Sequence, residues 1–107
     1  MAAEVIRRIL AREAPTTSAV AKEMGCSVRT LQARLKAEGT SFGEVLADER
    51  RTLAVRLLEN REIRIKELPY LLQYRDARQF FRAFVKWTGT TPTEYRRRTA
   101  TEPLPVS

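Results

Sequence analysis

Four residues of one expected helix have the types and the spacing needed to read the edges of DNA bases. They recur at positions i, i+3, i+4 and i+7, and they are Arg29, Gln32, Ala33 and Lys36. A helix places residues at this spacing on one face. Arginine most often reads guanine, glutamine reads adenine, and a small side chain can contact the thymine methyl group. For this helix alone, a basic face that is merely solvated is an equally good interpretation.

A second expected helix carries a similar face. Arg78, Phe81 and Arg82 follow the same spacing, and Ala77 stands at the start of the helix. Phe81 leaves two interpretations open, because its ring could contact a thymine methyl group or pack beside Phe80 in the core. Two such helices, each following a tight turn, favour DNA reading over a solvated basic surface.

The two helices are followed by nearly the same sequence. Residues 39–45 read Gly-Thr-Ser-Phe-Gly-Glu-Val, and residues 89–95 read Gly-Thr-Thr-Pro-Thr-Glu-Tyr. Each of these stretches closes a segment that reads as helix, tight turn and longer basic helix. Such a repeat predicts one supersecondary unit used twice.

The charge of the chain points to an anionic partner. Its 107 residues include 20 Lys and Arg against 13 Asp and Glu, which gives a net charge of +7. Nucleic acid is the first candidate partner and an anionic membrane surface the second. No apolar run reaches the roughly 18 residues of a membrane span. A helix lying on a membrane surface is also disfavoured, because the regular apolar stripes are needed by the core, so we expect no membrane partner.

Histidine is absent and cysteine occurs once, as Cys26. A structural zinc site needs about four such ligands, so we expect no metal site. A single cysteine also forms no disulfide within the chain, which fits a reducing compartment and predicts a cytoplasmic protein. The missing histidine removes the commonest general base. No phosphate-cradling glycine loop and no plausible carboxylate pair is present, so we expect neither an enzyme nor a cofactor.

Hydrophobic spacing, caps and breakers predict an all-α chain of about seven helices. Capping boxes are expected at Ser41 with Glu44, and at Asp76 with Gln79. The expected helices cover about residues 3–14, 17–24, 28–38, 41–60, 65–72, 77–88 and 91–98. We therefore expect one DNA-binding domain over residues 1–107, with a first helix-turn-helix unit at 3–40, a linker helix at 41–60, a second unit at 61–98 and a loose tail at 99–107.

Two longer stretches carry a family resemblance. Residues 20–32 read Val-Ala-Lys-Glu-Met-Gly-Cys-Ser-Val-Arg-Thr-Leu-Gln, residues 80–89 read Phe-Phe-Arg-Ala-Phe-Val-Lys-Trp-Thr-Gly, and residues 91–96 read Thr-Pro-Thr-Glu-Tyr-Arg. The chain resembles the DNA-binding domain of AraC/XylS-type transcription regulators over about residues 16–98. The resemblance implies two homeodomain-like helix-turn-helix subdomains on one linker helix, with both recognition helices (28–38 and 77–88) in successive major grooves. The family's reading positions map to Arg29, Gln32, Ala33, Lys36, Ala77, Arg78, Phe81 and Arg82.

The second unit departs from the family pattern. Gln73 and Tyr74 stand where the family usually has Gly-Phe, and Pro69 stands where alanine is usual. Gln73 costs more than glycine if its φ is positive. We expect the helix at 65–72 to start late or bend, and the second unit to be the less rigid one.

The expected function is sequence-specific DNA binding in transcription regulation. The alternative is a helical protein-interaction domain that has lost DNA binding. Double-stranded DNA is the expected partner, and RNA polymerase is a candidate second partner. Relatives in this family usually carry an effector-binding or dimerisation domain; we expect it to be absent from this chain, and the chain to be a monomer. An activator role is an expectation only, because no residue separates activation from repression.

Overall fold

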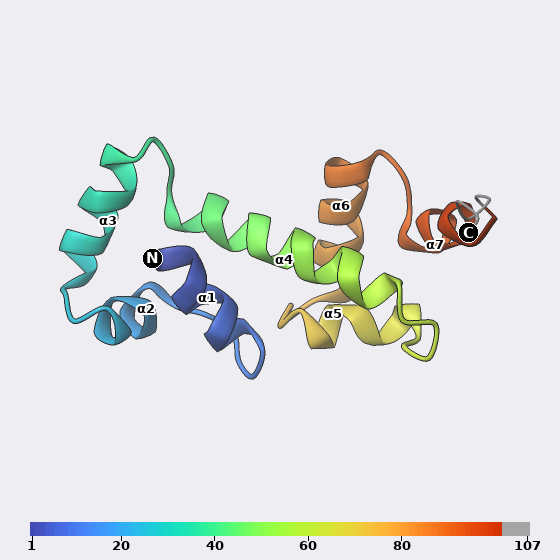
Figure 1. Cartoon of the computed structure of the whole chain (residues 1–107), viewed down its shortest axis with the longest axis horizontal. Coiled ribbons are helices and arrows are strands. Elements are labelled where there is room, and N and C mark those ends of the chain that lie inside the picture. The colour runs from blue at the N-terminus through green and yellow to red at the C-terminus, as the bar shows by residue number, and fades with distance from the viewer. Residues whose placement is uncertain (102–107) are drawn as a thin grey trace, which may run out of the picture.

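The computed structural model describes residues 1–101, and side-chain environments over residues 1–99. Those residues form seven α-helices and one short 3₁₀ helix without any strand, which confirms the all-α prediction (Figure 1). None of these helices is long and apolar enough to cross a membrane. The elements in chain order are α1 (Ala2–Leu10), α2 (Thr17–Glu23), α3 (Val28–Ala37), α4 (Phe42–Leu58), η1 (Ile65–Glu67), α5 (Leu68–Leu71), α6 (Ala77–Thr88) and α7 (Pro92–Thr101).

Two separate hydrophobic cores organise these helices along the long axis of the molecule. The first lies between α1, α2 and α3, and its buried side chains are Ala2, Val5, Ile6, Ile9, Val20, Ala21, Leu31 and Leu35. The second lies between the C-terminal half of α4, α5 and α6, and its buried side chains are Ala54, Leu58, Leu68, Leu72, Phe80 and Phe84. In Figure 1, α1–α3 surround one end of α4, and α5–α7 surround the other.

Helix α4 serves both cores, and this explains the break in its apolar pattern. Phe42, Val45 and Leu46 pack against the first core, whereas Leu53 and Leu57 pack against the second. The charged residues 48–51 lie between these two apolar groups. The interruption of the hydrophobic stripe therefore marks the place where α4 passes from one core to the other.

Side-chain caps begin most of the helices where the sequence predicts them. The Ser27 hydroxyl accepts a hydrogen bond from the Thr30 amide at 3.1 Å, and Ser41 accepts one from the Glu44 amide at 3.2 Å. The predicted capping boxes are incomplete, however. The Glu44 carboxylate accepts from the Thr40 hydroxyl at 3.0 Å, and Asp76 accepts from the Arg78 amide rather than from Gln79. In each box another donor takes the place of one predicted donor.

Two predicted boundaries are wrong. The helix expected over residues 3–14 ends at Leu10, because the amides of Arg12 and Glu13 both donate to the Ile9 carbonyl at 3.0 and 2.9 Å. These bonds close a turn ahead of Pro15, which disfavours helical backbone at the preceding residue. At the other end, α7 continues to Thr101, so the tail expected from residue 99 begins too early. The remaining predicted tail, residues 102–107, lies outside the described residues.

Candidate nucleic-acid interface

Helix α3 presents the predicted reading face to solvent. Its buried side is formed by Leu31 and Leu35, which are 0% and 3% exposed in the first core. The opposite side consists entirely of exposed residues, namely Arg29, Gln32, Ala33 and Lys36. Among the described residues, none of the three polar side chains in this set has a hydrogen bond or an ion pair. The face therefore offers unpaired donors and two positive charges.

Helix α6 is anchored in the same way by Phe80 and Phe84, both fully buried. Its predicted readers Ala77, Arg78 and Arg82 are exposed, and Phe81 is half-buried. The Arg78 guanidinium lies 3.3 Å from the Asp76 carboxylate, although its side chain remains 86% exposed.

The Asp76 carboxylate changes the charge of the α6 face. Its pKa is held below the ordinary value, first by the hydrogen bond from the Arg78 backbone amide and then by the Arg78 guanidinium. The carboxylate is therefore ionised at neutral pH and sits beside Arg78 and Arg82. The α6 face combines two positive charges with one negative charge, whereas the α3 face has two positive charges alone.

Phe81 packs beside Phe80 and remains partly exposed, and its contact with DNA stays a prediction. Its ring centroid lies 5.2 Å from that of Phe80 in a tilted arrangement, so it packs against the second core. The remainder of the ring, together with Asp76, Arg78 and Arg82, lines a hollow in the surface. An aromatic edge is thus present among the charged groups of this face.

Arg50 of α4 holds the turn that precedes α6, and sequence reasoning missed it. Its Nε donates to the Leu72 carbonyl at 3.0 Å and its Nη2 donates to the Gln73 carbonyl at 2.8 Å. The guanidinium carbon lies 4.1 Å above the centre of the Tyr74 ring. Burial lowers the pKa of the Arg50 guanidinium, and burial raises the pKa of the Tyr74 hydroxyl. The available signal was a charged residue at an otherwise apolar position of a helix.

The turn held by Arg50 is strained, as its sequence predicts. Gln73 has a φ of 63°, whereas Gly25, in the equivalent turn of the first unit, has a φ of 73°. Left-handed backbone costs a residue with a Cβ about 1 kcal/mol or more, but costs glycine almost nothing. The predicted late start of the preceding helix is also confirmed, because a 3₁₀ turn comes before α5 and Pro69 lies in the first turn of α5.

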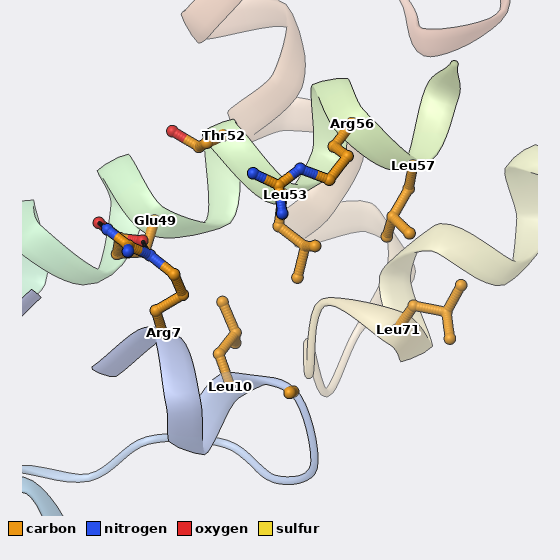
Figure 2. A pocket seen from close by; sticks show the side chains of 9 residues that line it. Arg7, Leu10, Glu49, Thr52, Leu53, Arg56, Leu57 and Leu71 are labelled. Carbon is orange, nitrogen blue, oxygen red and sulfur yellow. Dashed lines mark hydrogen bonds and ion pairs between the residues drawn. The ribbon is translucent and has the colours of Figure 1, made fainter. Parts of the chain in front are cut away.

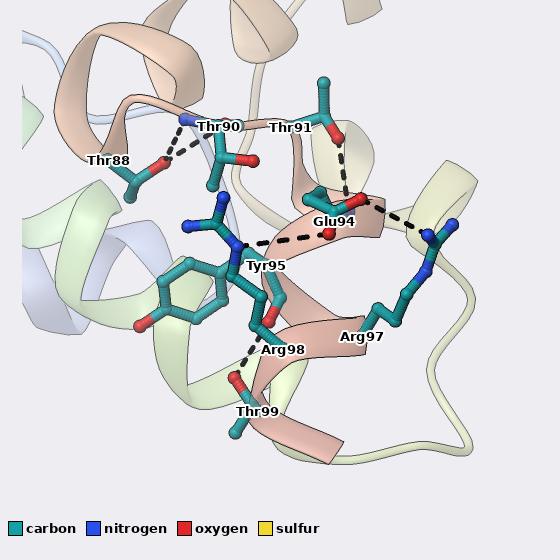
Figure 3. A network of polar contacts seen from close by, with 8 residues as sticks. All are labelled: Thr88, Thr90, Thr91, Glu94, Tyr95, Arg97, Arg98 and Thr99. Atoms are coloured by element: carbon teal, nitrogen blue, oxygen red, sulfur yellow. Dashed lines mark hydrogen bonds and ion pairs between the residues drawn. The ribbon is translucent and has the colours of Figure 1, made fainter. Parts of the chain in front are cut away.

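The basic run at residues 96–98 is tied into the structure. Arg96 donates through Nε to the Leu58 carbonyl at 3.1 Å and through Nη2 to the Asn60 carbonyl at 3.2 Å, which caps the C-terminus of α4. Figure 3 shows Arg97 and Arg98 reaching back to Glu94, at 3.4 and 3.9 Å. This run therefore supports α4 and α7 in addition to any contact with phosphates.

The two candidate faces stand at opposite ends of α4. In Figure 1, α3 and α6 run in the same direction and are separated along the long axis of the molecule, which measures 47 Å. A sequence model described as a helix-turn-helix domain matches residues 20–98. The chain belongs to the AraC/XylS-type helix-turn-helix family. This is a family of DNA-binding transcription regulators and not a class of enzymes.

Individual relatives agree with this assignment. An HTH-type transcriptional regulator of Mycobacterium tuberculosis is 42% identical over 84 residues, which cover 78% of this chain and 24% of the relative. The ornithine utilization regulator of Pseudomonas aeruginosa is 38% identical, over 86% of this chain and 28% of its own length. The chain thus spans about a quarter of the length of these curated relatives.

A solved structure gives the same result for the fold. The crystal structure of a DNA-binding transcriptional dual regulator from Escherichia coli K-12 superposes with a TM-score of 0.87 at 30% identity, covering 94% of this chain and 90% of that one. The helical domain is therefore a DNA-binding module of transcription regulation. Within residues 1–101 no cluster of acidic, cysteine or histidine side chains could hold a metal ion.

Proposed function

We propose that α3 and α6 are recognition helices that enter successive major grooves on one side of duplex DNA. The observation that carries this proposal is the pair of exposed basic faces, each backed by its own core and joined by α4. Major grooves on one side of B-DNA recur every ~34 Å. The long axis of 47 Å leaves room for two contacts at that separation.

Each face contacts both base edges and the phosphate backbone. On α3, Arg29 and Gln32 read bases near the start of the helix, Ala33 lies close to a thymine methyl group, and Lys36 contacts a phosphate. On α6, Arg82 is the main base reader, because among the described residues it has no ion pair within 4 Å. Arg78 exchanges its exposed pair with Asp76 for DNA, while Phe81 and Ala77 contribute apolar contacts.

The two contacts differ in strength. The Asp76 carboxylate repels phosphates and partly neutralises the α6 face, and the backbone that leads into α6 is strained at Gln73. The α3 face includes no carboxylate, and the turn before it has glycine at its left-handed position, Gly25. The first unit therefore contributes more of the affinity, and the second unit contributes more of the length of the recognised site.

The wider biology follows the same proposal. Residues 3–40 and 61–98 act as two units of one DNA-binding domain with residues 41–60 as the linker helix. The domain binds DNA as a monomer in the cytoplasm, and an activator role would bring RNA polymerase into contact with the bound protein. The full site should span two half-sites, one helical turn apart.

Selection of bound sequences from a random duplex pool tests the proposal, followed by salt titration on the enriched site. We expect two enriched half-sites about ten base pairs apart, and a slope of log K against log[salt] that becomes less steep by about one unit in Lys36→Ala. Arg82→Ala should relax the base preference in one half-site only, at a cost of about 1–3 kcal/mol. Arg61→Ala, an exposed arginine outside both faces, is the matched control.

Two results would contradict this function. The first is the absence of any enriched sequence, with binding that does not depend on salt. The second is an equal loss of affinity in Arg82→Ala and in Arg61→Ala, because the face of α6 would then contribute only its charge.

A further inference from the structure

A cavity of about 310 Å³ lies between the two units, on the side of α4 that carries α1 and α5. Its lining comes from three helices: Leu10 from α1, Leu53 and Leu57 from α4, and Leu71 from α5. Figure 2 shows Leu10, Leu53 and Leu57 bordering one open space between α1, α4 and α5, with Leu71 at its edge. No residue of α3 or α6 lines the cavity, so it is distinct from the proposed DNA-binding faces.

The apolar part of this cavity is open to solvent. Leu71 is 42% exposed and is one of few large hydrophobic residues of the described chain that solvent reaches so freely. Covering a leucine side chain stabilises a complex by roughly 25 cal/mol per Å² of apolar area removed from water. An occupant with an aliphatic body would therefore gain free energy from the four leucines.

The charged rim of the cavity selects the head group of such an occupant. Arg7 donates to both carboxylate oxygens of Glu49, at 2.8 and 3.3 Å, so these two charges neutralise each other. Arg56 also lines the cavity, and among the described residues it has neither a hydrogen bond nor an ion pair. Figure 2 shows its guanidinium extending over Leu53. The rim thus holds one uncompensated positive charge directly above apolar side chains.

The volume of the cavity suits a small molecule. It measures about 310 Å³ and lies at the lower end of the range of small-ligand sites, ~300–1,000 Å³. A compact ligand therefore fits it.

We propose that this cavity binds a small amphiphile with an aliphatic chain and a single carboxylate head. The chain lies among Leu10, Leu53, Leu57 and Leu71, and the carboxylate accepts hydrogen bonds from the Arg56 guanidinium. Because the lining joins α1 of the first unit to α5 of the second, one bound molecule contacts both halves of the domain.

Octanoate is the probe, and its binding to the ¹⁵N-labelled chain is followed by amide chemical shifts. We expect saturable shifts at Leu53, Leu57 and Leu71, and binding at least about tenfold weaker for octylamine, whose cationic head meets Arg56. Acetate controls for the attraction of any anion to this basic chain, and it should leave the leucine amides unshifted. These measurements need no DNA, so they stand or fall independently of the proposed function.

Variants test the contacts of the carboxylate head and of the aliphatic tail of octanoate separately. Arg56→Gln should weaken octanoate about tenfold without changing the melting temperature, since the side chain is exposed and unpaired. Leu71→Ser, also at the surface, should weaken it through the lost apolar contact. Arg61→Gln is the matched charge control and should bind octanoate normally.

Any one of the following outcomes overturns the proposal. Octylamine could bind as tightly as octanoate, or Arg56→Gln and Arg61→Gln could lose the same affinity. The shifts could instead spread over α3 and α6, which would show anion attraction to the basic faces. A concentration-dependent dimer that buries Leu71, or saturation of the cavity by a leucine-rich acidic peptide with no octanoate binding, would identify a protein as the occupant.

Discussion

Replacing Arg50 with methionine should detach the second helix-turn-helix turn from α4. The substitution keeps a long apolar stem but removes the two hydrogen bonds to the carbonyls of Leu72 and Gln73, at 3.0 and 2.8 Å. It also removes the guanidinium that lies 4.1 Å above the Tyr74 ring.

The size of the effect follows from these contacts. Hydrogen bonds that involve a charged group contribute about 1.5 kcal/mol each at the lower end of their range, and the cation–π contact about 0.5 kcal/mol. Burial disfavours the charged form of Arg50, as its lowered pKa shows, and that desolvation cost disappears in the variant. We expect the free energy of unfolding of the second unit to fall by about 2 kcal/mol.

Tryptophan fluorescence measures this unit selectively. The chain has one tryptophan, Trp87, and its ring packs against Phe84 of the second core with the ring centres 6.3 Å apart. Urea unfolding followed at this residue should move to lower denaturant in Arg50→Met. Arg50→Lys should lose most of the same stability, because an ammonium group cannot reproduce the planar fork that bonds two carbonyls. Binding to a half-site read by α3 alone should be unchanged.

The control is Arg51→Met, at the next position of α4. Arg51 is exposed and makes only a 3.8 Å pair with Asp48, which contributes little at the surface. The reasoning about the turn is refuted if Arg50→Met and Arg51→Met shift the Trp87 transition equally, or if Arg50→Met costs less than about 0.5 kcal/mol.

Three further predictions concern the second unit. Gln73→Gly should raise its free energy of unfolding by about 0.5 kcal/mol, because relief of the left-handed strain outweighs the added entropy of the unfolded chain. The pKa of Asp76 is lowered in the folded state, so the carboxylate stabilises the fold above its ordinary pKa of 3.8 and loses this effect as pH falls through the lower folded value. The stability difference between the wild type and Asp76→Asn should therefore change below about pH 4. Arg96→Met should cost about 1–2 kcal/mol, because it removes both bonds that cap α4.

A different result would contradict each of these three predictions. If Gln73→Gly unfolds at lower urea than the wild type, φ at this position carries little strain. A constant difference between wild type and Asp76→Asn from pH 5 to pH 2 would exclude a native-state interaction of the carboxylate. Arg97→Met, which removes an exposed pair with Glu94, should cost less stability than Arg96→Met, and an equal loss in the two variants would remove the capping argument.

Local chemistry explains which parts of the fold the sequence predicts. Ser27 and Ser41 begin their helices because a cap needs only an amide three residues away. Phe80 and Phe84 stand four residues apart, and this spacing predicts the buried side of α6 because residues so spaced lie on one face of a helix. The exposure of seven of the eight candidate readers follows once the buried side of each recognition helix is known, whereas the DNA contacts of all eight stay predictions.

Contacts between distant residues explain what the sequence does not predict. Arg50 reaches carbonyls more than twenty positions away, and Arg96 caps a helix that ends 38 positions earlier. Arg50 stands at an otherwise apolar position of α4, but nothing local in the sequence indicates which carbonyls Arg50 or Arg96 would bond. The first helix is predicted too long for a local reason. Its alanine-rich sequence favours helix up to Ala14, but the turn closed by hydrogen bonds to the Ile9 carbonyl ends it at Leu10.

Because both cores share α4, the length of this helix sets the angle between α3 and α6 about its axis. Each residue of an α-helix advances the chain by ~1.5 Å and rotates it by ~100°. Inserting or deleting one residue near Asp48 would therefore turn α6 to a different side of the molecule from α3, while hardly altering their separation. A length change in the connection at residues 59–64 would leave this phase intact, because these residues follow the end of α4. Evolution of the domain should thus vary its loops in length while keeping the 17 residues of α4 constant.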